Sequence, residues 1–443
     1  MVKLIGMLSR LGPAKVLVIG DFMLDTYTTG KIQRISPEAP VSVLNAHKEE
    51  SLPGGAGNVV LNLRSLGAQV TVVGRVGRDF AGEEIRNALE NEMVDVGGLV
   101  YQKRYKTPVK NRFIADSQQV LRVDFETITS LPEELEQEVI RKLPDLMEDC
   151  QIVAISDYGK EFLSHTLLGV VIEMAKARHV PVIVDPKGID FTKYRGATII
   201  KPNLSEAYAA ARLPQEISLD EVSATILKTC GVEQLLITRS QEGISLFNRN
   251  GDRFDFPVRS KEVKDVTGAG DTVLSMLSVA LANGLDIRYA AQLANIAAGM
   301  AIERIGCALI NLSDMADRLM EFDVENKIFD GQHMFALQQS LKGKRCSVLS
   351  LESNHGMSTA VFKSLRKLAA KDPENKLVLY LRGHQPDREF ISLLSSLSDV
   401  DFIVVECTSL KNLCDLIEPA EIYAIEASKL IDLEKSPTQL ANV

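Results

Sequence analysis

The stretch of the sequence best suited to chemistry is residues 264–272, which read KDVTGAGDT. Gly268 and Gly270 flank one small residue, so the backbone is free to turn sharply and to present successive N–H groups to an anion. Apolar residues then recur at helical spacing over 273–281, and Asn283-Gly284 is a typical helix stop. The pattern predicts a glycine-rich loop that leads into a helix, whose positive end stabilises a bound phosphate.

Asp271 lies at the start of this predicted helix, beside the amides that would hold the phosphate. A phosphate repels a carboxylate, so an acid at this place favours a role in accepting a proton from a hydroxyl that attacks phosphorus. Aspartate is also a common helix cap, and a short Gly-x-Gly motif alone does not separate the two interpretations. The supporting residues must come from other parts of the chain.

Two further acids follow a predicted strand near the N-terminus. Residues 15–20 form a continuous apolar run, which is typical of a strand covered on both faces. Asp21 and Asp25 come directly after it, at the sheet edge where ligands bind in open α/β folds. We expect both acids to contact a substrate; the alternative is that they only form a turn.

Residues 53–58, PGGAGN, form a second glycine-rich entry into a helix, because apolar residues follow at helical spacing. Two short β-rich segments, residues 41–46 and 109–125, lie on either side of it. The second is interrupted by a polar turn at 115–118, as in a hairpin. We expect these segments to form a small β-lid over a site.

Farther along the chain, four apolar runs each end in a polar residue and are separated by helical patterns. This alternation predicts a parallel sheet with covering helices. Because the carboxyl ends of parallel strands meet at one edge of a sheet, the four polar ends would converge on a single cleft. The runs are residues 151–157, 180–185, 198–203 and 234–238.

Length and composition limit the classes of protein. A chain of 443 residues with 45% hydrophobic and 25% charged residues is globular, and two domains are expected. The net charge of −9 argues against a nucleic-acid partner. No apolar stretch is long enough for a membrane span or a secretory signal, so we expect a cytoplasmic protein without a membrane partner. The six scattered cysteines match neither a zinc site nor a disulfide scaffold.

The alternating pattern weakens over residues 310–332, and we place a domain boundary at residue 330. Beyond it, the tail is expected to form a second, smaller α/β domain. The predicted strands are residues 344–351, 376–382 and 401–406, and the predicted helices are residues 358–370, 387–397 and 409–417.

With these residues assembled, about the first 320 residues closely resemble the ribokinase-like (PfkB) carbohydrate kinases. The resemblance rests on Gly54-Gly55 with Asn58, on Asn203 with Glu206, and on Thr267 to Asp271, in the family's order and spacing. Within the family, the sequence is similar to the heptose 7-phosphate kinases of lipopolysaccharide precursor synthesis. That likeness is carried by residues 34–40, 156–158, 185–187, 238–240 and 266–272.

The resemblance implies a ribokinase-like fold: a mostly parallel central sheet flanked by helices, with a β-lid at about residues 31–46 and 100–125, in a kinase domain of residues 1–330. It implies transfer of phosphate from ATP to the anomeric hydroxyl of D-glycero-D-manno-heptose 7-phosphate, giving the 1,7-bisphosphate for ADP-heptose and lipopolysaccharide core synthesis. The expected partners are a sugar phosphate, ATP with Mg²⁺, and a second copy of the chain in a homodimer. The sequence does not decide whether a monovalent cation is required.

The resemblance also carries roles to single residues. Asp271 matches the catalytic base, and the amides of Gly268, Ala269 and Gly270 match the anion hole. Asn203 and Glu206 match the pair that organises magnesium and the triphosphate, with Glu206 as the metal ligand; the alternative is a helix capping box. The expected nucleotide contacts are Asn203, Glu206, Thr238, Gly243, Thr267 and Asn295.

Substrate contacts are expected from two groups of residues. Carboxylates and amides would serve the sugar hydroxyls, and basic side chains would offset the charge of the 7-phosphate. A single basic residue is more typical of a solvated lid surface, so only the cluster favours a phosphate site. The first group is Asp21, Asp25, Gly54, Gly55, Asn58 and Asp185, and the second is Lys110, Arg112, Arg122 and Lys187.

The tail departs from the family pattern. In many proteins of this branch a cytidylyltransferase-like domain follows the kinase, and residues 387–404 and 416–419 faintly resemble its second half. The His-x-Gly-His signature of that domain is missing, because residues 354–357 read NHGM. We interpret residues 331–443 as a degenerate cytidylyltransferase-like, nucleotidyltransferase-like α/β domain, kept for dimerisation, stability or regulation.

Two other functions stay open at this point. The chain could be a kinase of another sugar or sugar phosphate, or a non-catalytic sugar-sensing or scaffold protein. The presence of Asp271, Asn203 and Glu206 together argues against the second of these.

Overall fold

The chain folds into two compact units in the computed structural model. One unit is Gly12–Ile310, and the other joins Met1–Leu11 to Asn311–Val443. The structure describes residues 4–8, 10–116, 118–258, 262–321, 327–331, 333–352, 356–372, 374–383, 387–405, 409–426 and 429–433. The division at residue 310 falls earlier than the boundary at 330 expected from the sequence, and the second unit also takes the first eleven residues.

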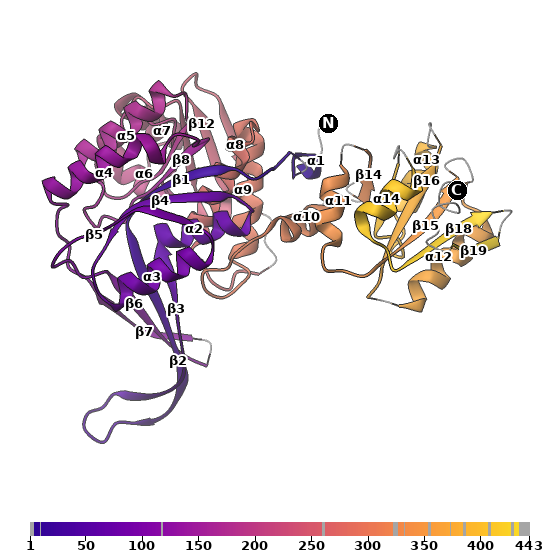
Figure 1. Cartoon of the computed structure of the whole chain (residues 1–443), viewed down its shortest axis with the longest axis horizontal. Coiled ribbons are helices and arrows are strands. Elements are labelled where there is room, and N and C mark those ends of the chain that lie inside the picture. The colour runs from indigo at the N-terminus through magenta and orange to yellow at the C-terminus, as the bar shows by residue number, and fades with distance from the viewer. Residues whose placement is uncertain are drawn as a thin grey trace. The chain divides into compact units, whose positions relative to one another are not determined.

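The larger unit is built on a central sheet in which the described strands follow the order β13-β12-β11-β10-β9-β8-β1-β4-β5 (Figure 1). Neighbours from β11 to β5 are parallel, whereas β12 and β13 continue one edge as antiparallel strands. The strands are β1 (Lys15–Gly20), β4 (Gln69–Val76), β5 (Asp95–Tyr101), β8 (Ile152–Ser156), β9 (Val182–Asp185), β10 (Ile199–Ile200), β11 (Gln234–Thr238), β12 (Ile244–Asn248) and β13 (Arg253–Phe256). All four apolar runs expected as strands are strands, and the predicted fold class is confirmed.

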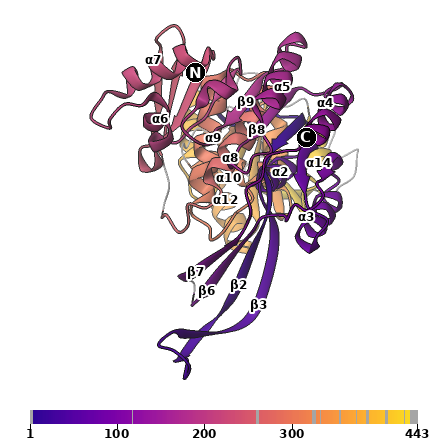
Figure 2. The same ribbon diagram turned by 90° about the vertical axis from the view of Figure 1, so that its left-hand side faces the viewer.

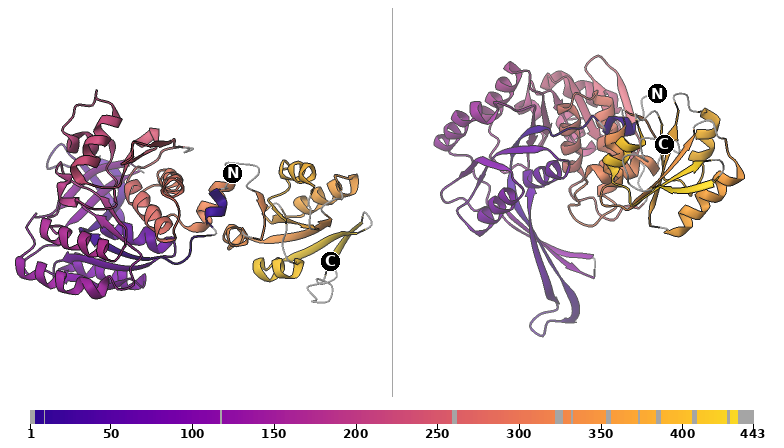
Figure 3. Two further views of the ribbon diagram at one scale, coloured as in Figure 1. Left: turned by 90° about the horizontal axis from the view of Figure 1, so that it is seen from above. Right: turned by 45° about the vertical axis from the view of Figure 1, so that its right-hand side comes forward.

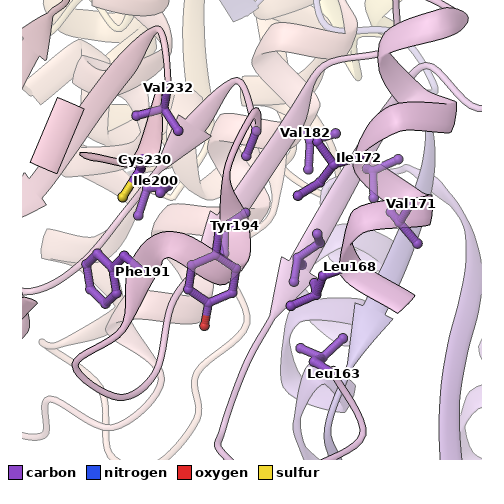
Figure 4. Close-up of a cluster of buried hydrophobic side chains, with 14 of the residues drawn as sticks. Leu163, Leu168, Val171, Ile172, Val182, Phe191, Tyr194, Ile200, Cys230 and Val232 are labelled. Carbon is purple, nitrogen blue, oxygen red and sulfur yellow. The ribbon is translucent and has the colours of Figure 1, made fainter. Parts of the chain in front are cut away.

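Helices cover both faces of this sheet because its strands are apolar on both faces. In β1, Leu17 and Ile19 join the core formed with α4 (Glu133–Leu146), α5 (His165–Ala177), α6 (Leu204–Ala211) and α7 (Leu219–Cys230). Figure 4 shows part of this core, with Phe191 and Tyr194 packed beside Cys230 and Ile200. The other layer contains α2 (Ala56–Ser65), α8 (Ala269–Ala282) and α9 (Ile287–Ala301), which pack on one another.

A four-stranded β-lid extends from the larger unit (Figure 2). Its strands are β2 (Phe22–Ile35), β3 (Ser42–Gly55), β6 (Val109–Ala115) and β7 (Gln118–Phe125), in the order β3-β2-β6-β7. The lid starts directly after Asp21 and is longer than the sequence predicted. Asp25 and Lys110 lie near the starts of the parallel neighbours β2 and β6, where they are register partners at the base of the lid.

The order of the strands opens a crevice beside β1. From β1 the chain builds β4 and β5 on one side, and it then returns to place β8 on the other side. Loops that follow neighbouring strands diverge at such a switch point, and ligands bind in the gap outside the carboxyl ends of the strands. Asp21 follows β1 and Asp157 follows β8, so two acids meet the crevice.

The smaller unit is a separate α/β layer with its own apolar core (Figure 3). Its strands follow the order β14-β17-β16-β15-β18-β19, with β19 antiparallel at one edge. All three predicted tail strands and all three predicted tail helices are present, whereas His355 and Cys407 lie outside the described residues. The strands are β14 (Ile328–Phe329), β15 (Cys346–Glu352), β16 (Lys376–Arg382), β17 (Phe402–Val404), β18 (Glu421–Glu426) and β19 (Lys429–Leu433). The helices are α1 (Leu4–Leu8), α10 (Leu312–Glu321), α11 (Met334–Leu341), α12 (Thr359–Lys371), α13 (Arg388–Ser395) and α14 (Leu410–Ile417).

None of the helices described here has both the length and the apolar character that crossing a membrane requires.

The N-terminal helix is part of the smaller unit because α1 packs on α10 and α11 and buries Leu8. We predict that Leu8→Ala destabilises the smaller unit by roughly 2–5 kcal/mol, as expected when a buried leucine leaves a cavity. Hydrogen–deuterium exchange should show faster exchange in β15 and β16 and unchanged exchange in β1 and β8. Leu63→Ala, a matched buried leucine of α2, should have the opposite pattern, and a Leu8→Ala effect confined to residues 12–310 would refute the assignment.

Candidate active site

A polar cleft lies at the carboxyl ends of the central strands, beside the start of α8. It carries four acids and two lysines, and it joins groups that lie far apart in the sequence. The carboxyl ends of β8, β9, β10 and β11 contribute to it, as the convergence of polar strand ends predicted. The residues that line it are Asp157, Tyr158, Asp185, Pro186, Lys187, Lys201, Asn203, Glu206, Thr238, Gly268, Gly270 and Asp271.

Asp271 is buried in the first turn of α8 with both carboxylate oxygens hydrogen-bonded. The Asn58 amide donates to Oδ2 at 2.6 Å, and the Tyr158 hydroxyl donates to Oδ1 at 2.8 Å. These donors come from α2 and from the loop after β8, so the carboxylate does not cap its own helix. Burial raises the pKa of Asp271 to about 7, although the two hydrogen bonds and Lys201 oppose the rise.

The loop before α8 leaves backbone donors for an anion. Gly268 has φ 77°, and a Cβ there would lie 2.8 Å from Asn58 Nδ2, so both backbone and space require glycine. Among the described residues, the amides of Gly268 and Gly270 make no hydrogen bond, whereas the Ala269 amide donates to the Val266 carbonyl at 3.3 Å. Two of the three amides expected in the anion hole are therefore open to a ligand.

Thr267 is turned toward its own loop. Its amide and hydroxyl both donate to Asp265 Oδ1, at 2.9 and 2.7 Å, and Asp265 Oδ2 accepts from the Gly306 amide. Asp265 thus fixes the loop before α8 to the segment after α9. Thr267 lines neither the polar cleft nor the apolar cleft beside it, which is described below. It therefore does not lie where a nucleotide contact was expected.

Asp21 and Asp25 are both buried at the base of the lid. Asp21 Oδ2 accepts from the amides of Tyr158 and Lys160, while Asp21 Oδ1 is buried and has no hydrogen-bond partner among the described residues. Burial, followed by the charge of Asp157, raises the pKa of Asp21. Asp25 pairs with Arg112 at 2.7 Å, and a Cβ on Gly54 would collide with the Asp25 carboxylate. The structure therefore brings together the two acids and the glycines of the second glycine-rich segment.

Lys201 and Tyr158 lie in the polar cleft although neither was selected from the sequence. Lys201 is buried at the end of β10 and pairs with Asp185 at 3.0 Å, near the position that a Cβ on Gly270 would occupy. Burial raises the pKa of Asp185, and Lys201 opposes the rise. A lysine at the end of an apolar run was a signal for Lys201, but no pattern in the sequence pointed to the bond between Tyr158 and Asp271.

Asn203 and Glu206 form the capping box that the alternative interpretation expected. Asn203 Oδ1 accepts from the Glu206 amide at 2.9 Å, and Glu206 Oε2 accepts from the Asn203 amide at 3.0 Å. Glu206 Oε1 pairs with Lys187 at 2.9 Å, and both residues line the polar cleft. Capping places these groups at the cleft, so the structural and functional interpretations are compatible.

An apolar cleft adjoins the polar cleft, and the two share Thr238 and Gly270. Gly243 and Asn295, which were expected to contact a nucleotide, line it as well. The Asn295 amide donates to the carbonyls of Phe256 and Pro257, so it also ties α9 to β13. Its other lining residues are Ser240, Gln241, Ile244, Val258, Val263, Val266, Ala269, Val273, Ala298, Gly299 and Ile302.

The basic residues expected to form one cluster are divided between two places. Lys110, Arg112 and Arg122 lie on the lid, where Arg112 and Arg122 are register partners on β6 and β7. Lys187 instead pairs with Glu206 beside α6. Arg112 is committed to Asp25 and Arg122 to Asp124, whereas Lys110 makes no ion pair with any described residue. Burial and the nearby Lys160 lower the pKa of Lys110.

Comparison with known families shows that the chain belongs to the pfkB carbohydrate kinases. The family model described as "pfkB family carbohydrate kinase" matches residues 13–314. The chain is 37% identical over 442 residues to the bifunctional protein HldE of Syntrophotalea carbinolica, covering 93% of this chain and 88% of that protein. It is 43% identical over 323 residues to the bifunctional protein HldE of Trichlorobacter lovleyi, covering 72% of this chain and 66% of that protein.

Solved structures share the fold of the larger unit at low sequence identity. Ribokinase of Arabidopsis thaliana, complexed with ribose and ATP, matches with a TM-score of 0.55 and 20% identity over 70% of this chain and 99% of that chain. Phosphofructokinase-2 of Escherichia coli, in complex with potassium, matches with a TM-score of 0.57 and 17% identity over 70% of this chain and 98% of that chain.

We predict that Asp271→Asn makes the protein more stable relative to wild type as pH rises. The folded pKa of about 7 lies above the ordinary 3.8, so the aspartate's contribution to stability is complete below about pH 4 and is lost as pH rises to 7. Between pH 5 and 8 the stability difference should grow by roughly 2–3 kcal/mol. Urea unfolding at both pH values measures this change, and a difference that is equal at the two would contradict it.

Proposed function

Since the chain belongs to the pfkB family of carbohydrate kinases and is an ATP-dependent sugar kinase, we propose that its acceptor is D-glycero-D-manno-heptose 7-phosphate. Phosphorylation of the anomeric hydroxyl would give the 1,7-bisphosphate, a precursor for ADP-heptose and the lipopolysaccharide core. The observation that carries the proposal is the meeting of the buried acid Asp271 with the open amides of Gly268 and Gly270, together with the lid residues Lys110, Arg112 and Arg122. Use of ATP fits the cytoplasmic location expected from the sequence.

We infer that ATP spans the two adjoining clefts. The apolar cleft fits a flat purine base, and Thr238 and Gly270 connect it to the polar cleft, where phosphates would meet the start of α8. Lys201 is buried beside Gly270 and carries the positive charge suited to an anion there. The γ-phosphate would then lie near the amides of Gly268 and Gly270, and near Asp271.

Magnesium would depend on the nucleotide as much as on the protein. Within the described ranges, no group of three or more His, Cys, Asp or Glu side chains is arranged to hold a metal ion. Mg²⁺ suits such a place, because it keeps several waters and binds through one or two carboxylates plus substrate phosphates. Glu206 is the carboxylate we infer for it, and it would supply charge neutralisation at the phosphates. Lys187 pairs with Glu206 in this structure, and it would remain beside the phosphates when the metal is bound.

The 7-phosphate of the acceptor is inferred to lie under the lid. Lys110 and Arg112 are two residues apart on β6, so both project from the same face of the lid as their register partners Asp25 and Tyr27. Arg112 directly opposes Arg122 on β7, and each arginine is paired with an acid, Asp25 and Asp124. Lys110 makes no ion pair with any described residue, so it is the cation to which we assign the dianionic phosphate.

The transfer itself asks little covalent chemistry of the protein. Asp271 would take the proton of the anomeric hydroxyl as its oxygen forms a bond to the γ-phosphorus. The bond from that phosphorus to the β–γ bridging oxygen breaks, and ADP leaves. Asp21 Oδ1, which is buried with no partner in the part of the chain that the structure describes, would accept a hydrogen bond from a neighbouring sugar hydroxyl. A base with a pKa of about 7 suits this task at neutral pH.

We also propose that the smaller unit is a degenerate cytidylyltransferase-like domain. The described strands β17, β16, β15 and β18 are parallel neighbours between β14 and the antiparallel β19, and such a mostly parallel α/β layer suits a nucleotide-binding fold. The bifunctional protein HldE of Syntrophotalea carbinolica aligns over 93% of this chain. The His-x-Gly-His signature is absent from the sequence.

We further propose a homodimer through the lid, whose exposed apolar residues include Ile35, Leu121 and Phe125.

The acceptor is tested with a panel of free and phosphorylated sugars, measured by ATP consumption. We predict turnover of the heptose 7-phosphate, and a rise of at least about tenfold in its KM in Lys110→Met, because a charge-assisted bond to phosphate is lost. The KM for ATP should not change. Lys48→Met, which removes an exposed lid lysine paired with Glu50, is the matched control. A hexose phosphate turned over in place of the heptose would refute the acceptor and leave the kinase activity intact.

The smaller unit is tested separately. We predict that the protein makes no nucleotide sugar when it is incubated with heptose 1-phosphate and CTP or ATP, because the histidines that would bind the nucleotide's phosphates are missing. Chromatography of the products measures this. A clear nucleotide-sugar product would overturn the degenerate interpretation.

A further inference from the structure

Tyr158 connects the two acids of the crevice between β1 and β8. Its hydroxyl donates to Asp271 Oδ1 at 2.8 Å, and its backbone amide donates to Asp21 Oδ2 at 2.9 Å. Burial, together with the charge of Asp271, raises the pKa of Tyr158 well above its usual range, so its hydroxyl is the donor in the bond to the carboxylate. No role follows for this tyrosine from the fold alone, because a phenylalanine would fill the same space.

We propose that Tyr158 is a positioning residue for phosphoryl transfer, which fixes the orientation of the Asp271 carboxylate and stabilises its negative charge. The inference rests on the proposed role of Asp271 as the base. Asn58 holds Oδ2 and Tyr158 holds Oδ1, so the carboxylate cannot rotate. Each carboxylate oxygen accepts more than one hydrogen bond, and the remaining lone pairs stay free for the proton of the attacking hydroxyl.

The backbone amide of Tyr158 makes a second contact, to Asp21, which relates the base to the acceptor-binding acid. We assign a sugar hydroxyl to Asp21 Oδ1, which no described residue contacts by a hydrogen bond, and Asp21 Oδ2 is fixed by the amides of Tyr158 and Lys160. One short segment therefore sets the base and the acceptor-binding acid relative to each other. Such coupling matters because small misplacements of reacting groups reduce rates strongly.

The charges around Asp271 explain why its hydrogen bond from the Tyr158 hydroxyl matters for ionisation of the carboxylate. The groups around Asp271 are Asn58 on α2, Tyr158 after β8, Asp185 on β9, Lys201 after β10, and Cys307 after α9. Asp185 opposes ionisation of Asp271, and Lys201, which favours it, is already paired with Asp185. Neutral donors must therefore hold the charge, and Tyr158 is one of two that do so.

Tyr158→Phe tests the inference through the pH dependence of single-turnover phosphoryl transfer at saturating ATP and sugar phosphate. Loss of a hydrogen bond to a charged group should move the midpoint of the acid limb upward by roughly one to two pH units. The rate should fall by about fivefold to fiftyfold at pH 7 and recover at and above pH 9, with little change in either KM. Tyr158→3-fluorotyrosine keeps the ring and donates more strongly, so its acid limb should move downward.

Tyr194→Phe is the control, because Tyr194 is also a buried tyrosine that donates to a carboxylate, that of Asp157 at 2.7 Å. It should lose similar thermal stability without moving the acid limb. An acid limb that stays in place in Tyr158→Phe, or that moves in the same direction in both Tyr158 variants, would overturn the role of Tyr158. Asp271→Asn should lose about 10²–10⁴ in rate. An active Asp271→Asn enzyme would instead overturn the base assignment, so the two failures are distinct.

Discussion

A carboxylate buried beside another acid is the constraint on which the larger unit depends. Desolvation disfavours an ionised Asp271, and Asp185 adds to the cost. The protein offsets the cost with neutral donors from two elements, α2 and the loop after β8, and with the ion pair that couples Asp185 to Lys201. The balance leaves a pKa of about 7, at which a carboxylate is a far stronger base than an exposed aspartate yet is substantially ionised at neutral pH.

The sheet topology brings one of these donors, Tyr158, to the crevice. Because β8 is placed beside β1 only after the chain has built β4 and β5, the loops after β1 and β8 face each other across a crevice. Asp21 and Tyr158 then meet through a backbone hydrogen bond. The helices α2 and α8 reach the site only with their first turns, where unpaired backbone amides can offset the negative charge of a bound anion. The apolar core, and not the polar site residues, stabilises this fold. Residues in the loops can therefore be substituted without loss of the fold.

Much of the fold could be predicted because it depends on local patterns. Apolar runs with polar ends gave the parallel strands, and glycine-rich segments before apolar periodicity gave the starts of α2 and α8. Long-range pairings could not be read in the same way. The bond between Tyr158 and Asp271 joins residues 113 positions apart, and the separation of Lys187 from the lid cations depends on its partner Glu206. The N-terminal helix was missed because five helical residues have too little periodicity, and its place is decided by packing on α10 and α11.

The two units also show that a fold depends little on the polar groups that carry chemistry. The strands β15, β16 and β18 of the smaller unit are nearly continuous apolar runs, and their core of leucine, valine and isoleucine needs no histidine to form. Removal of a signature motif from a loop therefore costs such a domain little stability. In the larger unit the polar groups lower stability, since Asp271 is buried and Asp21 Oδ1 has no hydrogen-bond partner among the residues that the structure describes. A buried acid that destabilises the fold needs a functional reason to be there. The presence of Asp21 and Asp271 in the larger unit therefore supports activity more strongly than the presence of an intact sheet does in the smaller unit.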